Sequence, residues 1–99
     1  MAIYKNTTDV TTTLITKGEK ISGRINEVLI CNQSTHAGGA EIDLYLENAA
    51  AAKYYFLKEV VMPSGSSLLL DNDLSFDGSV FHLKIKNDGT SPSLTITIK

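Results

Sequence analysis

The sequence predicts an all-β fold, an antiparallel β-sandwich of jelly-roll or immunoglobulin-like type with about seven or eight strands. β-Branched residues are frequent along the 99 residues, whereas Pro occurs 2 times and Trp is absent. Apolar and polar residues alternate in several segments, which is the period of a strand with one buried face. Turn-forming residues recur at the roughly 8–12-residue spacing expected of a sandwich.

Three segments show this alternation most clearly: Ala40–Glu47, Phe81–Lys86 and Leu94–Lys99. In the first segment, every second residue from Ile42 to Leu46 is apolar and the residues between them are polar or aromatic. Each segment is therefore predicted to be a strand that buries one face.

Three further segments are predicted to be strands. Ile21–Asn32 is long, and its apolar parity slips near Asn26-Glu27, which indicates a bulge or a strand that turns a corner between sheets. Val28–Cys31 is apolar on both faces and is predicted to lie in the middle of a sheet. Ser67–Leu70 is a short apolar strand between turn signals, and Thr11–Thr16 is a Thr-rich strand or edge strand.

The segment Asn48–Glu59 admits two interpretations. Its alanines favour a helix capped by Asn48. The aromatic and β-branched residues that follow favour a hairpin, with Asn48–Ala52 as the loop and Lys53–Met62 as the second strand. We favour the hairpin because both neighbouring segments are predicted strands.

The chain is predicted to form one β-sandwich domain over residues 14–99, with residues 1–13 as an extended N-terminal arm or an edge strand. The inward-facing set follows from the alternation of the predicted strands. It comprises Ile25, Ile30, Ile42, Leu44, Leu46, Phe56, Leu68, Leu70, Phe81, Leu83, Ile85, Leu94 and Ile96.

Charge and composition exclude several classes of protein. Nine basic residues against 11 acidic ones give a net charge of -2, so we expect no nucleic-acid partner. No apolar run reaches membrane length, so we expect no membrane-spanning helix. The start, Met1–Lys5, lacks the apolar core of a signal peptide, and the single cysteine rules out a disulfide framework; folding in a cytoplasm is the expectation.

Two groups of residues are candidates for a catalytic or metal-binding site. Cys31 and His36 could supply a nucleophile and a base, but a cysteine at the end of an apolar strand is more often a small packed thiol. Asp71, Asp73 and Asp77 look like a calcium loop, yet their spacing does not fit an EF-hand, and Asp is an ordinary turn former. We therefore predict no catalytic residue, no metal site, no cofactor and no enzymatic activity.

Charged side chains are predicted to cover the outer face of a sheet. Glu41, Asp43 and Glu47 share one face of their strand, and Lys84 and Lys86 share one face of theirs. These residues are expected to be solvated, and the two strands are expected to be cross-strand neighbours.

Three tyrosines were considered as a binding platform. Tyr45, Tyr54 and Tyr55 could stack on a sugar, although half-buried sheet tyrosines are commoner. A carbohydrate-binding or adhesion module is therefore the alternative function.

Several segments resemble a known group of proteins. They are Ile21–Asn32, which reads Ile-Ser-Gly-Arg-Ile-Asn-Glu-Val-Leu-Ile-Cys-Asn, the alternating Ile42–Leu46, the aromatic Tyr54–Phe56, and Met62–Leu70, which reads Met-Pro-Ser-Gly-Ser-Ser-Leu-Leu-Leu. The pattern, over about residues 14–99, is similar to small β-sandwich structural proteins of tailed bacteriophage particles. The resemblance implies a head decoration protein or a neck or tail accessory, and it carries over no catalytic residue.

The expected function is thus a non-enzymatic structural protein of a bacteriophage virion, assembled in the host cytoplasm and bound in repeated copies to capsid or tail proteins. We also expect a homo-oligomer, because Thr11–Thr16 and Leu94–Ile98 are predicted to be uncharged edge strands. Residues 1–13 would then pair with a neighbour's edge, and the alternative is an arm that pairs within its own sheet or stays disordered.

Overall fold

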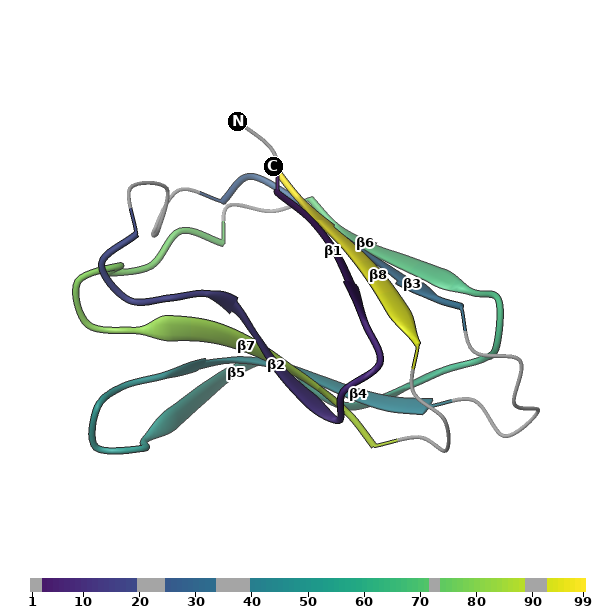
Figure 1. The fold of residues 1–99 in the computed structure, drawn as a ribbon, viewed down its shortest axis with the longest axis horizontal. Coiled ribbons are helices and arrows are strands. Elements are labelled where there is room, and N and C mark those ends of the chain that lie inside the picture. Colours follow the sequence, from purple (N-terminus) through teal and green to yellow (C-terminus); the bar gives the residue numbers. More distant parts are fainter. Residues whose placement is uncertain (1–2, 20–24, 34–39, 72–73, 89–92) are drawn as a thin grey trace.

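The computed structural model describes residues 3–19, 25–33, 40–71, 74–88 and 93–99. These residues form two four-stranded antiparallel sheets that face each other (Figure 1), so the predicted all-β sandwich is confirmed. The strands are β1 (Ile3–Thr7), β2 (Thr11–Ile15), β3 (Val28–Asn32), β4 (Ala40–Glu47), β5 (Lys53–Met62), β6 (Ser67–Leu70), β7 (His82–Asn87) and β8 (Leu94–Ile98).

The strand order is that of a jelly roll. One sheet has the order β1-β8-β3-β6 and the other has the order β2-β7-β4-β5. Each strand of the first half of the chain pairs with one of the second half: β1 with β8, β2 with β7, β3 with β6 and β4 with β5. The chain is thus a long antiparallel ribbon that rolls up, and rolling brings β3 against β8 and β4 against β7. This topology decides between the two predicted sandwich types.

The β4–β5 hairpin is the tip of that ribbon. Its loop is Asn48–Ala52, and β5 has the predicted bounds, so the hairpin is confirmed and the helix is wrong. The Asn48 Oδ1 atom accepts hydrogen bonds from the amides of Ala50 and Ala52, each at 3.0 Å. Ala51 takes a left-handed conformation, with φ of 63°. Asn48 therefore closes a tight turn and does not start a helix.

The predicted inward-facing residues all lie at the core between the sheets. Phe56, Leu68, Leu70 and Phe81 are only partly buried there, because they pack against the margin of the cluster. The sequence prediction omitted Leu14, Ile15, Val28, Ala40, Tyr45, Met62 and Ile98, which are also buried.

A bulge explains two of the omitted residues. The register of β2 on β7 shifts between Thr13 and Ile15. Leu14 and Ile15 are neighbours in sequence, yet each is only 1% exposed. A regular strand would send one of them outward, so their shared burial depends on the bulge.

A second irregularity lies where the sequence predicts one. The amides of Asn26 and Glu27 both donate to the carbonyl oxygen of Lys99, at 2.7 and 3.0 Å. Two successive amides facing one residue is the hydrogen-bond pattern of a β-bulge. The earlier part of the predicted Ile21–Asn32 strand, residues 21–24, lies outside the described residues.

β3 lies between β8 and β6, so its predicted place inside a sheet is confirmed. The apolar residues on its two faces are not equally buried. Leu29 is 38% exposed, whereas Val28 and Ile30 are fully buried. The outer face of this sheet carries no second layer in the described part of the chain.

The edges of the sheets differ in part from those predicted. β2 is an edge strand as expected, but Leu94–Ile98 is not, because β1 adds outside β8. The expected division after residue 13 falls inside β2. Two contacts join β1 to β2: Lys5 Nζ donates to the Thr13 carbonyl oxygen at 3.0 Å, and the Thr7 and Thr12 hydroxyls lie 2.6 Å apart.

Candidate functional site

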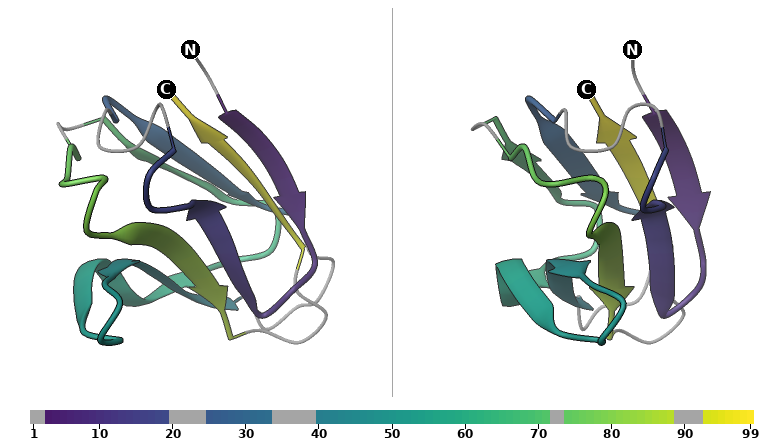
Figure 2. Two further views of the ribbon diagram at one scale, coloured as in Figure 1. Left: turned by 60° about the vertical axis from the view of Figure 1, so that its left-hand side comes forward. Right: turned by 90° about the vertical axis from the view of Figure 1, so that its left-hand side faces the viewer.

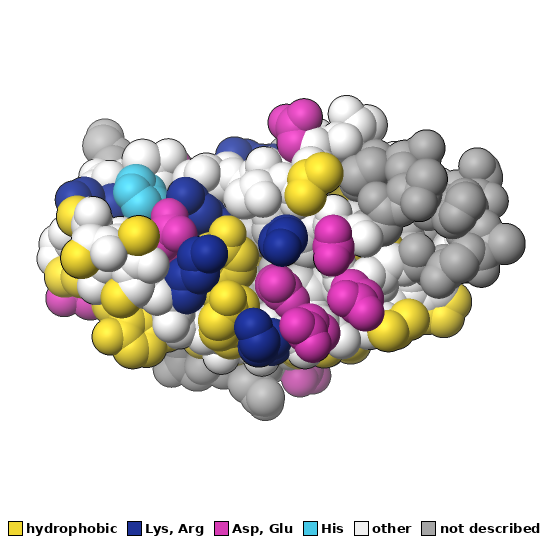
Figure 3. Space-filling view, turned by 90° about the horizontal axis from the view of Figure 1, so that it is seen from below, with side chains coloured by type: hydrophobic (Ala, Val, Ile, Leu, Met, Phe, Trp, Pro, Cys, Tyr) yellow, Lys and Arg dark blue, Asp and Glu magenta, His cyan; other side chains and the backbone are white. Residues whose placement is uncertain are grey.

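The two outer faces of the sandwich differ in charge. The outer face of β2-β7-β4-β5 carries Glu41, Asp43, Glu47, Lys84 and Lys86, and we call these residues the charged face. Figure 3 looks onto it and shows acidic and lysine side chains gathered there. β4 and β7 are paired, as predicted, with Asp43 opposite Lys86.

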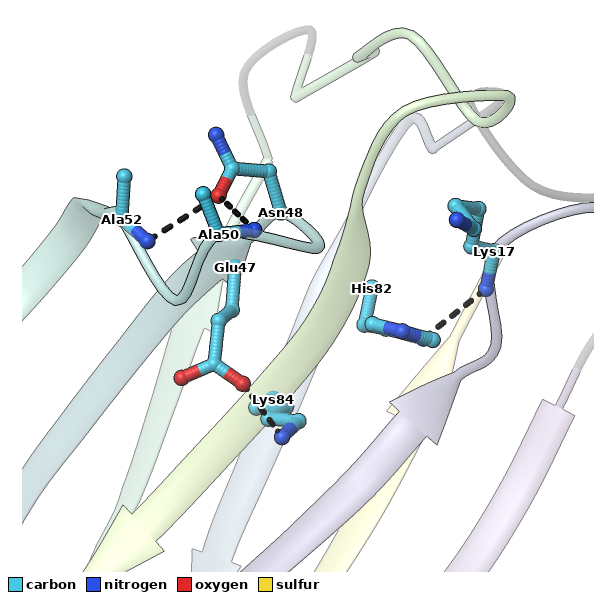
Figure 4. A network of polar contacts seen from close by, with 7 residues as sticks. All are labelled: Lys17, Glu47, Asn48, Ala50, Ala52, His82 and Lys84. Carbon is cyan, nitrogen blue, oxygen red and sulfur yellow. Dashed lines mark hydrogen bonds and ion pairs between the residues drawn. The ribbon is translucent and has the colours of Figure 1, made fainter.

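The strongest ion pair of the charged face joins Glu47 to Lys84. The Lys84 Nζ atom lies 2.6 Å from Glu47 Oε1, and the side chains are 23% and 17% exposed (Figure 4). The hydrogen bond from Lys84 lowers the pKa of Glu47, and the same bond raises the pKa of Lys84. Because Glu47 and Lys84 bind each other, neither charged group of the pair is available to a ligand.

His82 lies on the same face as this pair. It is half-buried there. Its Nδ1 atom accepts a hydrogen bond from the Lys17 amide at 3.0 Å (Figure 4). His82 therefore anchors the turn after β2.

The three tyrosines do not share one platform. Tyr45 and Tyr55 face each other across β4 and β5 with ring centroids 5.5 Å apart, but Tyr45 is only 4% exposed. Burial raises the pKa of Tyr45, and the charge of Glu47 adds to this effect. Tyr54 points to the opposite side of β5, where its ring meets Phe81 edge-on at 5.6 Å. Tyr45 is thus a buried sheet tyrosine, more deeply buried than the half-buried side chain that was expected.

The other outer face is uncharged. The outward residues of its strands are Tyr4, Asn6, Leu29, Cys31, Ser67, Leu69, Thr95 and Thr97, and we call them the neutral face. Strand register aligns Tyr4, Thr97, Leu29 and Leu69 in one row across the sheet.

The row exposes apolar surface. Tyr4 is 72% exposed, Leu69 51% and Leu29 38%. Among the described residues, charge appears at one end of the face, where Lys99 and Glu27 lie 3.7 Å apart. The neutral face was not among the sequence predictions. Its signal is that the outward positions of four strands are all uncharged, but only the strand order shows that these strands share a sheet.

Of the candidate residues for nucleophilic or metal chemistry, the structure describes Cys31, Asp71 and Asp77. Cys31 is half-buried on the neutral face. His36 and Asp73 lie outside the described residues. Asp77 Oδ1 accepts hydrogen bonds from the Ser79 hydroxyl at 2.6 Å and from its amide at 3.0 Å, which lower the pKa of Asp77. These bonds are those of a turn.

Within the described ranges, no group of three or more His, Cys, Asp or Glu side chains is placed to hold a metal ion. The same ranges contain no helix long and apolar enough to cross a membrane.

No protein-family model and no curated protein sequence matches the chain. Solved structures with a similar fold include the SPBc2 prophage-derived protein YomS, with 14% identity, a TM-score of 0.45, and coverage of 98% of this chain and 91% of that one. A structure of infectious bursal disease virus Gx strain has 16% identity and a TM-score of 0.42. The match covers 98% of this chain and 29% of that one. The CBM22-1 xylan-binding domain of Paenibacillus barcinonensis Xyn10C has 8% identity and a TM-score of 0.40. The match covers 96% of this chain and 83% of that one. These likenesses assign neither a family nor a function.

Proposed function

We propose that the protein is a non-enzymatic structural component of a bacteriophage virion, bound in repeated copies to capsid or tail proteins through the neutral face. The observation that carries this proposal is the contrast between the two outer faces. The charged face has the mixed charge of a solvated surface, whereas the neutral face exposes Tyr4, Leu29 and Leu69 in one row.

The neutral face suits a protein partner. Its outward side chains carry no charge, so docking would not strip water from an ion. The apolar row would lose contact with water, and the surrounding Thr, Ser and Asn side chains offer hydrogen bonds at the rim. One such face is small, so a single copy would bind weakly, and repeated copies on a symmetric surface would multiply the effect.

The motifs behind the resemblance to phage proteins also support the proposal. Asn32 ends the first of them, and Pro63 and Gly65 lie in the last. The structure brings these residues into contact: Gly65 donates its amide to the Asn32 carbonyl oxygen at 2.8 Å. The matched pattern thus corresponds to one interlocked part of the fold.

Binding to particles tests the proposal. Purified protein should co-sediment with phage particles of the genome that encodes it, once the native copies are removed. Leu29→Lys places a charge at the centre of the neutral face and should weaken binding about tenfold or more. Val61→Lys is the matched control, because Val61 is 62% exposed on the other sheet. Equal binding by both variants would refute the role of the neutral face, and no binding by the unaltered protein would refute the function.

A carbohydrate-binding or adhesion module is the second candidate. Tyr54 is 57% exposed and is supported edge-on by Phe81, so its ring is open to stacking. Jelly rolls occur in viral capsids and in lectins, and the fold alone does not choose between them. A glycan array tests this candidate: binding that is lost in Tyr54→Ala and kept in Val61→Lys would favour it over the virion protein.

A further inference from the structure

Within the described part of the chain, β6 is an edge strand without the usual protection. Its residues, Ser67–Leu70, include no charge and no proline, and its register on β3 is regular. Natural edge strands are usually blunted by charges, prolines, bulges or covering segments. An uncharged, regular edge is therefore open to pairing with another strand.

The β5 edge, in contrast, is protected. β5 carries Lys53, Lys58 and Glu59, and its register on β4 shifts twice. Glu59 lies at the first shift in a left-handed conformation, and its amide donates to Asp43 Oδ1 at 2.6 Å. β1 and β2 lie together on the opposite side of the sandwich from β5 and β6 (Figure 2, right), and the Lys5 side chain joins them.

Backbone alternation shows which groups of β6 face outward. The amide of Asn32 donates to the Ser66 carbonyl oxygen at 2.9 Å, so Asn32 and Ser66 are a hydrogen-bonded pair in which the Ser66 carbonyl points toward β3. In an antiparallel pair, every second residue does the same. Leu68 therefore bonds to β3, and the N–H and C=O groups of Ser67 and Leu69 point to the open edge.

The core is also incompletely covered at this edge. Leu68 and Leu70 point inward, yet both remain only partly buried. Phe56 and Leu57 of β5, on the same side of the sandwich, are partly buried as well. A further strand beside β6 would cover the inward leucines and satisfy the outward backbone groups.

We propose that a second copy of the chain supplies this strand, with β6 pairing antiparallel to its counterpart about a two-fold axis at Leu69. This register is self-complementary. Leu69 lies opposite its own counterpart, Leu68 opposite the partner's Leu70, and Ser67 opposite the partner's Asp71. Each leucine of β6 thus lies opposite a leucine of the partner. Asp71, which follows β6, lies opposite the hydroxyl side chain of the partner's Ser67.

The same register matches the backbone. Ser67 and Leu69 direct their amides and carbonyls outward, and they are the residues that would exchange hydrogen bonds across the axis. The rows of the neutral face would continue into the second copy, because Leu69 ends the row that begins at Tyr4. The pairing itself does not require a particle. Its use, a neutral face of doubled width, rests on the proposed function.

Charge substitution at the axis tests the pairing. Sedimentation equilibrium of the unaltered protein should show a monomer–dimer equilibrium. Leu69→Glu and Leu69→Lys each place two like charges side by side at the axis. Each variant should therefore weaken the affinity of the dimer about tenfold or more. An equimolar mixture of the two variants should restore dimers, because opposite charges then meet. Val61→Lys, on the other sheet, should dimerise normally.

Three results would overturn the proposal: a protein that stays monomeric at millimolar concentration, a dimer insensitive to charge at Leu69, and a mixture of the two variants that stays monomeric. These results are separable from the particle experiment. Monomeric protein that still binds particles through Leu29 would refute the dimer alone. A charge-rescued dimer that is absent from particles would refute the proposed function alone.

Discussion

The Asn32 side chain donates a hydrogen bond to the carbonyl oxygen of Met62 at 2.9 Å. Asn32 ends β3 in one sheet and Met62 ends β5 in the other, so this bond joins the two sheets. Asn32 is fully buried. A buried amide that satisfies a carbonyl at the end of a strand holds the crossover from β5 to β6 in place.

Asn32→Asp is expected to destabilise the fold by about 2 kcal/mol or more, because an ionised carboxylate cannot donate to Met62 and is buried. Part of the loss should return at low pH, where a protonated carboxyl can donate. Chemical denaturation as a function of pH measures both effects. Asn6→Asp is the control: Asn6 is exposed and its Oδ1 atom accepts from Thr95, a role that a carboxylate keeps. Equal stability of the two variants would contradict this role of Asn32.

Truncation of central core residues should be costly. Leu44 and Leu83 are fully buried between the sheets. Replacing either with Ala should cost about 2–5 kcal/mol of unfolding free energy, from lost burial and from the cavity left behind. Val61→Ala, at a site 62% exposed, should cost about 1 kcal/mol or less. A loss below about 0.5 kcal/mol at Leu44 would mean that its strand faces the other way.

The turn at the ribbon tip should respond to its two unusual residues. Asn48→Ala removes the acceptor for the Ala50 and Ala52 amides and should cost about 1 kcal/mol, whereas Asn48→Asp keeps an acceptor and should cost less. Ala51→Gly should stabilise by up to about 1 kcal/mol, since glycine adopts positive φ without steric cost. Thermal unfolding ranks the variants, and destabilisation by Ala51→Gly would contradict the left-handed turn.

The Glu47–Lys84 pair predicts a pH dependence. The pKa of Glu47 is lower in the folded protein than in the unfolded chain because Lys84 donates to it. The stability from this shift is therefore complete above the ordinary carboxyl pKa of about 4.3 and is lost as pH falls through the lowered value. Since the pKa of Lys84 is raised, its share is lost only as pH rises through that raised value.

Glu47→Gln measures this contribution directly. The variant should be less stable than the unaltered protein at pH 7, by about 0.5–1 kcal/mol. The difference in unfolding free energy should shrink at acid pH, where Glu47 is protonated in both states. A difference that grows as pH falls would contradict the direction of the Glu47 shift.

Metal removal should leave stability unchanged. Asp77 accepts two hydrogen bonds from Ser79, which is the work of a turn former. We expect the same melting temperature with and without a chelator. A melting temperature that falls by several degrees on chelation would contradict this expectation and would support Asp71, Asp73 and Asp77 as calcium ligands.

Local pattern was sufficient for most strands. Ala40–Glu47, Lys53–Met62 and Ser67–Leu70 have the predicted bounds, because alternation and turn residues are properties of neighbouring positions. Leu14 and Ile15 escaped the pattern, since a bulge breaks the period of two.

Strand order was beyond the reach of local pattern. Leu94–Ile98 was predicted to be an edge because it lies near the chain end, yet β1 covers it from the other end of the chain. Local pattern did not predict the neutral face for the same reason. Tyr4, Leu29 and Leu69 are far apart in sequence, and only pairing through β8 and β3 sets them in one row.

A cryo-EM map of the phage particle whose genome encodes this chain tests the central claim most directly. The map should show the protein in repeated copies, with Tyr4, Leu29 and Leu69 against the particle and the charged face toward solvent. Absence of the chain from the particle, or a bound copy whose neutral face points to solvent, would contradict the claim.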